Sequence, residues 1–129
     1  MLNGIAAAMP VFLRQGHGDF VTTVSTAGGL KIVPNMGVYA ATKNAVRTVL
    51  EALRQESTDG GVVRTTGISP GYVRTELGGP DRDPEIGSRM AAMAIAPPEA
   101  VARAVAFAIE QPPRDVEIGE ITIRPTVQN

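Results

Sequence analysis

Helical and extended patterns alternate along this chain, and this order constrains the fold more than any other feature of the sequence. Three runs rich in β-branched residues are separated by longer segments in which apolar residues recur every three or four positions. The patterns predict helices over residues 2–15, 38–57, 88–94 and 98–111, and strands over residues 19–25, 62–69 and 117–125. Strands that alternate with helices form parallel sheets covered by helices. The sequence therefore predicts a single α/β domain over residues 1–129, with a parallel sheet of about three strands and flanking helices.

Composition narrows the kinds of partner that this domain is expected to bind. The 129 residues are 43% hydrophobic and 19% charged with a net charge of −1, as expected for one soluble globular domain. The charges are scattered and no basic run is present, so we expect no nucleic-acid partner. Cysteine is absent and histidine occurs once, so we expect no metal site. Proline and charge interrupt the apolar stretches, and the first stretch has no basic leader, so we expect a cytoplasmic protein without a membrane segment.

Two irregular segments follow the first two predicted strands. They read STAGGLKIVPNMG and PGYVRTELGGP, and both are rich in glycine and proline, which favour loops over regular structure. In open parallel sheets, ligands bind beyond the carboxyl ends of the strands. The two segments are therefore expected to face each other across one cleft.

The helix predicted after the first of these segments carries Tyr39 and Lys43 four positions apart, at its start. On a helical wheel Tyr39 shares a stripe with Leu50 and Leu53, and Lys43 lies about 40° away at the edge of that stripe. The Tyr39–Lys43 pair has two interpretations. In the first, Tyr39 covers the core and Lys43 reaches water. In the second the pair is chemical, because an ammonium group within about 4–6 Å lowers the pKa of a phenol, which then acts as a general acid or base.

A different chemistry is suggested by the pentapeptide GISPG, which begins at Gly67 and matches the G-x-S-x-G pattern of serine hydrolases. Three observations argue against it. The residue after the serine, Pro70, has no N–H to donate to an oxyanion. His17 lies before the serine rather than after it, and an irregular segment follows where that fold has a helix. We therefore do not expect a hydrolase.

Two hydroxyl residues, Ser25 and Thr26, stand at the end of the first predicted strand, and Thr26 lies thirteen residues before Tyr39. Together the segments VTTVSTAGG, IVPNMGVYAATKNAV and GISPGYVRTEL resemble the catalytic half of the short-chain dehydrogenase/reductase family. The resemblance covers nearly the whole chain and implies a partial Rossmann-type doubly wound parallel sheet. It also implies an NAD(P)(H)-dependent oxidoreductase that transfers hydride reversibly between nicotinamide and a small carbonyl or alcohol substrate.

The resemblance assigns roles to residues that match the family's motifs. Tyr39 becomes the catalytic acid/base, and Lys43 the residue that assists it and binds the nicotinamide ribose. Thr26 stands in the register of the substrate-orienting residue, which in the family is usually serine. Ser25 is the alternative, although strand alternation points it the other way. The segment expected to contact the nicotinamide carboxamide contains Pro70, Gly71, Val73 and Thr75.

The family's glycine-rich cofactor turn has no clear counterpart here. The nearest pattern, Gly16-His17-Gly18, follows a helix and has Val21 where glycine is needed. We therefore expect the chain to correspond to the C-terminal half of such a reductase. Its last segment, PPEAVARAVAFAIEQPPRDVEIGEITIRPT, resembles NADP-dependent hydroxy-acid and aldehyde or ketone reductases, which favours NADP over NAD.

Two opposed expectations about assembly follow from the same resemblance. Family members associate through the helices that correspond to residues 2–15 and 38–57, which implies a homodimer or homotetramer. The alternative is a catalytically inactive fragment that acts as a binding or oligomerisation partner of a complete reductase.

Overall fold

The computed structural model describes residues 1–57, 63–76, 95–112 and 116–126. Its helices and strands follow the predicted order. They are α1 (Leu2–Gln15), β1 (Gly18–Thr23), α2 (Gly37–Glu56), β2 (Val63–Pro70), α4 (Pro98–Ile109) and β3 (Glu120–Ile123). The short helix expected over residues 88–94 lies outside the described residues. None of the described helices combines the length and the apolar character needed to cross a membrane.

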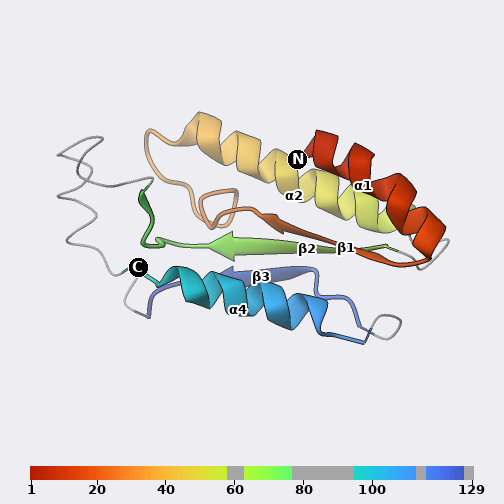
Figure 1. The fold of residues 1–129 in the computed structure, drawn as a ribbon. Coiled ribbons are helices and arrows are strands. Elements are labelled where there is room, and N and C mark those ends of the chain that lie inside the picture. Colours follow the sequence, from red (N-terminus) through yellow and green to blue (C-terminus); the bar gives the residue numbers. More distant parts are fainter. Residues whose placement is uncertain (58–62, 77–94, 113–115, 127–129) are drawn as a thin grey trace.

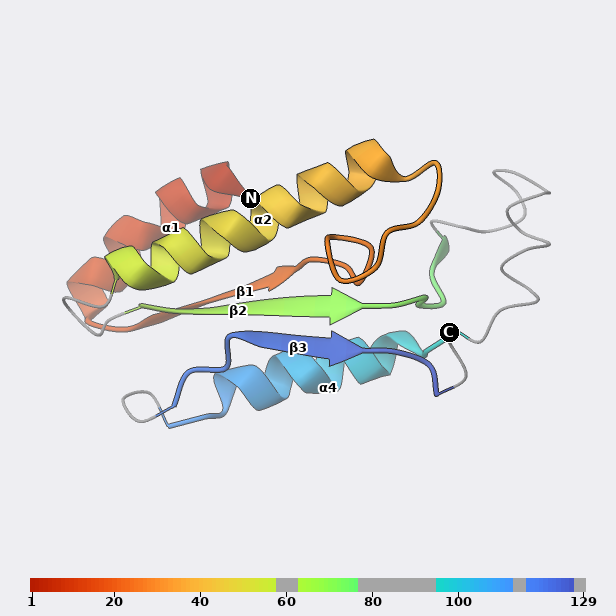
Figure 2. The ribbon, with the colours of Figure 1, turned by 180° about the vertical axis from the view of Figure 1, so that it is seen from behind.

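The three strands form one parallel sheet in the order β1-β2-β3. Gly18 of β1 pairs with Val63 of β2, and Gly67 of β2 pairs with Glu120 of β3. Helices α1 and α2 cover one face of the sheet and α4 covers the other (Figures 1 and 2), which confirms the predicted doubly wound α/β architecture. The connections through α2 and α4 step across the sheet in the same direction but on opposite faces, so the two crossovers have opposite hands.

Strand β2 is the centre of the core because it has a strand on each side and a helix on each face. Ile68 and Ser69 have no exposed surface, and Val63 is buried as well. The strand also buries threonine, which is tolerated because the hydroxyl is bonded: Thr65 Oγ1 donates to the carbonyl of Leu50 in α2 at 3.3 Å. The Thr65 hydroxyl therefore attaches β2 to α2, in addition to filling space in the core.

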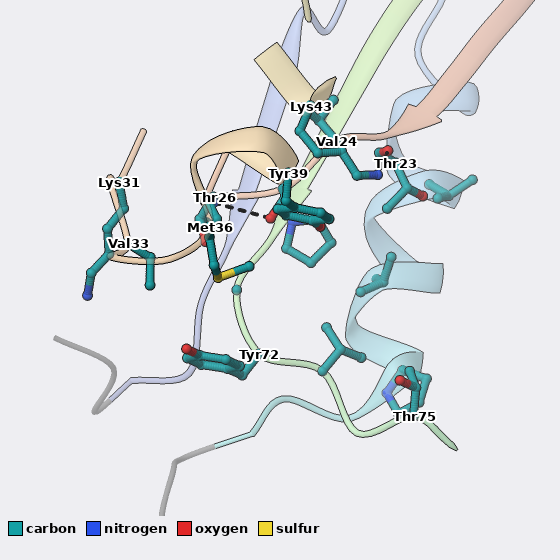
Figure 3. A pocket seen from close by; sticks show the side chains of 18 of the residues that line it. Thr23, Val24, Thr26, Lys31, Val33, Met36, Tyr39, Lys43, Tyr72 and Thr75 are labelled. Atoms are coloured by element: carbon teal, nitrogen blue, oxygen red, sulfur yellow. Dashed lines mark hydrogen bonds between the residues drawn. The ribbon is translucent and has the colours of Figure 1, made fainter. Parts of the chain in front are cut away.

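The apolar stripe predicted for α2 is confirmed at its C-terminal part. Leu50 and Leu53 are buried against the sheet. Tyr39 belongs to the same stripe, but its side chain is 41% exposed. The helix thus begins beyond the end of the sheet, and the first turn presents Tyr39 to a pocket rather than to the core (Figure 3).

The predicted end of the first strand was wrong by two residues, because β1 ends at Thr23 instead of residue 25. Hydrogen bonding to β2 nevertheless continues past that point. The N–H of Val24 donates to the carbonyl of Ile68 at 2.7 Å, and the N–H of Thr26 donates to that of Pro70 at 3.0 Å. The chain therefore leaves the sheet gradually and remains attached to β2 as far as Thr26.

The other boundary differences also have local causes. Helix α4 ends at Ile109 rather than at residue 111, because Pro112 disfavours the helical conformation of the residue before it. Strand β3 begins at Glu120 rather than at residue 117. Before it, the side chain of Glu117 accepts the N–H of Thr65 at 2.8 Å and takes the place of a backbone carbonyl.

Arg64 joins the amino end of the sheet to the end of α4. Its Nε donates to Asp19 Oδ1 of β1 at 2.7 Å, and its side chain is only 13% exposed. Its Nη1 donates to the carbonyls of Gln111 and Val116 at 2.9 and 3.2 Å, and its Nη2 donates to that of Ile109 at 3.3 Å. One planar guanidinium thereby satisfies carbonyls at the C-terminus of a helix, which have no partners within that helix.

Replacing this guanidinium should destabilise the fold. We expect Arg64→Met to lower the free energy of unfolding by about 2 kcal/mol, because Asp19 and the half-buried carbonyl of Gln111 lose their donor. The matched control is Arg54→Met, which removes an exposed ion pair with Glu51 and should change stability far less. Urea denaturation of both variants would measure the difference, and equal losses would contradict the role given to Arg64.

Candidate active site

A pocket of about 770 Å³ opens at the carboxyl ends of β1 and β2 (Figure 3). One wall is the segment that leaves β1 together with the first turns of α2, and the opposite wall is the segment that leaves β2. The predicted cleft between these two segments is therefore present. A third wall comes from α4, where Val101, Ala102 and Val105 line the pocket.

Tyr39 and Lys43 line this pocket from successive turns of α2. Lys43 Nζ lies 5.9 Å from the centre of the Tyr39 ring, so the ammonium group is close to the phenol. The same Nζ donates to the carbonyl of Thr23 at 3.1 Å, which holds the lysine against the end of β1 (Figure 3). Sequence spacing and a strand carbonyl together place a positive charge beside a half-exposed tyrosine.

Thr26 and Ser25 line the pocket as well, and they differ in their surroundings. Thr26 is 8% exposed, and its backbone is held on both sides: its N–H bonds to Pro70 and its carbonyl accepts the N–H of Lys31 at 2.9 Å. Ser25 is half-buried, and its Oγ accepts the N–H of Ala27 at 3.2 Å. Both residues thus line the same pocket as Tyr39, and which of them orients a substrate stays a prediction.

The last residue of β2 and the segment after it bring all four predicted residues to the pocket, namely Pro70, Gly71, Val73 and Thr75. Two contacts fix this segment. The N–H of Gly71 donates to the carbonyl of Ile123 in β3 at 2.7 Å. Val73 forms an isolated parallel bridge with Ala96, just before α4. The segment is therefore held between the last strand and the entry to the last helix.

Gly28 brings the loop after β1 into close contact with the helix that carries the lysine. A Cβ added at Gly28 would lie 2.7 Å from the Cβ of Lys43 and 3.2 Å from the carbonyl oxygen of Ser25. Only glycine allows this approach. The next residue, Gly29, has φ +104°, a backbone conformation that side chains rarely adopt. Glycine is thus required at position 28 by the close approach of Lys43, and it is favoured at position 29 by the positive φ.

An ionic cluster lies just behind the pocket wall. Arg47 of α2 and Glu120 of β3 form an ion pair with an Nη2–Oε1 distance of 2.8 Å, and the hydroxyl of Ser69 donates to the same carboxylate. The Arg47 guanidinium, with help from Ser69, holds the pKa of Glu120 below its usual range. Because Ser69 is fully buried and bonded to Glu120, it is no surface nucleophile, in agreement with the rejection of hydrolase chemistry.

Several pocket residues were not singled out from the sequence. They are Lys31, Val33 and Met36 of the loop after β1, Tyr72, and the α4 residues at the third wall. The apolar residues of α4 recur at helical spacing, which is typical of core positions. The sequence does not show that this helix faces a cavity. Within the described ranges, no group of acidic or histidine side chains is placed to hold a metal ion.

Comparison with known proteins identifies the family. The sequence profile of the short chain dehydrogenase family matches residues 1–86. The chain belongs to this family. An uncharacterized oxidoreductase of Listeria monocytogenes, Lmo0432, is 42% identical over 132 residues, a match that covers 99% of this chain and 52% of that protein. The short-chain dehydrogenase chain described here thus spans about half the length of the curated relatives it matches.

Solved structures agree with the predicted fold of this short-chain dehydrogenase chain. Serine dehydrogenase from Escherichia coli superposes with a TM-score of 0.75 at 29% identity, over 97% of this chain and 48% of that one. The closed form of serine dehydrogenase, complexed with NADP⁺, superposes with a TM-score of 0.78 at 27% identity, over 96% and 50% of the two chains.

The Gly28 contact generates a test of the loop. Gly28→Ala should lower the free energy of unfolding by about 1–3 kcal/mol, since the added methyl group forces the loop away from Lys43. Gly37→Ala is the matched control, because a Cβ at Gly37 meets nothing within 4 Å. Thermal or urea unfolding measures both. A Gly28→Ala variant as stable as Gly37→Ala would show that the loop does not depend on this contact.

The depressed pKa of Glu120 predicts how stability depends on pH. A carboxyl whose pKa is lowered by folding stabilises the protein above its unfolded value, near 4.5, and that contribution is lost as the pH falls through the folded value. The difference in unfolding free energy between the wild type and Glu120→Gln should therefore be largest near neutral pH and shrink below pH 4.5.

The pair Arg54–Glu51 provides a contrast for this measurement. Its hydrogen bond from Arg54 lowers the pKa of Glu51 to about 2, but both side chains are exposed, so added salt should screen the interaction. The effect of Glu51→Gln should disappear at high salt while that of Glu120→Gln persists. If both substitutions lost their effect on stability at high salt, the distinction between a partly buried Glu120 pair and an exposed Glu51 pair would be contradicted.

Proposed function

We propose that this chain carries the reaction site of an NAD(P)(H)-dependent oxidoreductase that acts on a small carbonyl or alcohol substrate. The observation that supports the proposal best is the meeting of Tyr39, Lys43 and Thr26 in one pocket at the carboxyl ends of two parallel strands. Ligands of open parallel sheets bind at this end. The relatives named as oxidoreductases point to the same class of reaction.

In the proposed reaction Tyr39 donates its phenolic proton to the substrate oxygen while a hydride reaches the carbonyl carbon. The carbonyl becomes an alcohol, and the reverse reaction returns the proton to the phenolate. Lys43, with Nζ 5.9 Å from the ring, stabilises the phenolate that remains. A hydroxyl of Thr26, or of Ser25, donates to the same substrate oxygen and holds it against Tyr39. General acid catalysis of this kind contributes about 10²–10⁴-fold to the rate.

The residues of the pocket fit the nicotinamide end of such a cofactor. Lys43 and Thr75 offer an ammonium and a hydroxyl group to ribose or carboxamide oxygens, and Gly71 leaves room beside the strand end. When bound, the nicotinamide ring would supply or accept the hydride. We favour NADP over NAD because the closed form of serine dehydrogenase, a structural relative, is complexed with NADP⁺.

Titration of the purified chain with NADPH and with NADH, followed by cofactor fluorescence, tests the proposal for this polypeptide. Saturable binding, tighter for NADPH, would support it and would justify a screen of carbonyl substrates. Absence of binding by a folded chain would contradict it.

A second candidate function is that of a binding or oligomerisation partner. The observation that favours it is the surface of α1, which has no buried residue and exposes Leu2 at 64% and Leu13 at 62%. The first residues of α2 add Val38, which is 83% exposed. We propose that these helices form a homodimer or homotetramer, or the contact with a complete reductase. Native mass spectrometry decides, and a strictly monomeric chain in the presence of such a reductase would exclude this function.

Tyr39 can be tested against the other tyrosine of the chain, since the sequence contains only two. Tyr39→Phe should lower the rate of carbonyl reduction by about 10²–10⁴-fold without changing the fold, because the proton donor is lost. Tyr72→Phe is the matched control, as Tyr72 lines the same pocket. It should change the rate much less. A Tyr39→Phe variant that keeps more than about a tenth of the rate would reject the assignment.

A further inference from the structure

Arg47 contacts three separate parts of the structure with one guanidinium. Its Nε donates to Glu120 Oε2 of β3 at 3.0 Å, and its Nη2 donates to Oε1 at 2.8 Å. The same Nη2 donates to the hydroxyl of Ser69 in β2 at 3.2 Å. Its Nη1 donates to the carbonyl of Gly28, in the loop after β1. Arg47 of α2 therefore connects the loop after β1 with strands β2 and β3.

The surroundings of Arg47 favour this bridging arrangement over a loose surface ion pair. The side chains of Arg47 and Glu120 are 24% and 29% exposed, so water screens them only in part. Ser69 is fully buried and itself donates to Glu120, which orients the carboxylate. A planar guanidinium can serve a carboxylate on one edge and a carbonyl on the other, whereas a lysine presents a single point charge.

The contact to Gly28 reaches the proposed site directly. Gly28 packs so closely on Lys43 that a Cβ would lie 2.7 Å from the Cβ of the lysine. Its N–H donates to the carbonyl of Ser25 at 3.0 Å, which closes the turn that contains Thr26. A fixed Gly28 carbonyl therefore fixes both the hydroxyl-bearing turn and the backbone beside Lys43.

We propose that Arg47 is a positioning residue for the proposed reaction. It is not among the residues that line the pocket. Held by Glu120 and Ser69, it anchors the Gly28 carbonyl, and through it sets the placement of Lys43 and of the turn from Ser25 to Gly28. The catalytic consequence of this inference rests on the proposed function. The position of Lys43 can be measured without turnover.

The composition of the chain makes the placement of Lys43 measurable, because Lys31 and Lys43 are its only lysines. Reductive methylation with ¹³C-formaldehyde labels these two amines and the N-terminus, and a Lys31→Arg variant assigns the signals. In Arg47→Met the Lys43 methyl signal should move away from its wild-type position, while the Lys31 signal stays.

Arg54→Met is the matched control. Arg54 lies on the same helix and makes the same kind of bidentate contact, with Glu51 one turn before it, and it does not line the pocket. It should leave both lysine signals unchanged. A folded Arg47→Met variant whose Lys43 signal matches the wild type would overturn the inference.

Two further variants separate positioning from simple ion-pair stability. Arg47→Lys keeps the charge beside Glu120 but cannot also reach the Gly28 carbonyl, so it should stay folded and still move the Lys43 signal. The amine that it adds gives one extra methyl signal, which a Lys43→Arg change made in the same variant leaves in place and thereby separates from that of Lys43. Glu120→Gln should move the signal in the same direction, because it loosens the anchor of Arg47. If Arg47→Met does not fold, these two variants decide, and an unmoved Lys43 signal in both would overturn the inference.

The rate measurement then separates this inference from the proposed function. Where the wild type reduces a carbonyl substrate, Arg47→Lys should lower kcat by about 10- to 100-fold with little change in KM, as expected for a misplaced catalytic group. A moved Lys43 signal with an unchanged kcat would overturn the catalytic part of the inference. A Tyr39→Phe variant with full activity would instead overturn the proposed function and leave the positioning of Lys43 intact.

Discussion

The burial of β2 on both faces and along both edges is the constraint on which the rest of this structure depends. Parallel pairing with β1 and β3 fixes the register of the sheet, and α2 and α4 close its two faces. A strand in this position can carry polar side chains only where they are bonded. Thr65 bonds to α2 and Ser69 bonds to Glu120, so the polar residues of β2 specify which neighbours it accepts.

The pocket is a consequence of where this strand ends. Past Thr23 the chain of β1 stays attached to β2 only through Val24 and Thr26, and then turns back toward α2. Past Pro70 the chain of β2 turns toward α4 instead. The two segments part at the same edge of the sheet, and the helices on opposite faces supply the remaining walls. Residues from both faces of the sheet are thereby brought to one cavity.

Features that depend on near neighbours in the sequence could be predicted from it. The order of elements, the cleft, and the placement of Tyr39 and Lys43 on one side of α2 follow from periodicity and from the four-residue spacing. Features that depend on distant pairs could not. The contact of Arg47 with Glu120 joins residues 73 positions apart, and the early start predicted for β3 failed because a Glu117 side chain replaces a backbone carbonyl. No local sequence pattern indicates that the crossover through α4 has the opposite hand to the crossover through α2.

The long separation between Arg47 and Glu120 also bears on the order in which the domain is assembled. Proteins are synthesised from the amino terminus, and early segments can fold before later ones exist. Thr26, Tyr39 and Lys43 are all made well before Glu120. A nascent chain that already pairs β1 with β2 would still lack the carboxylate that holds Arg47 against the Gly28 carbonyl. The Gly28 carbonyl can therefore gain this anchor only after Glu120 has been made, although the pocket residues of β1 and α2 come earlier in the chain.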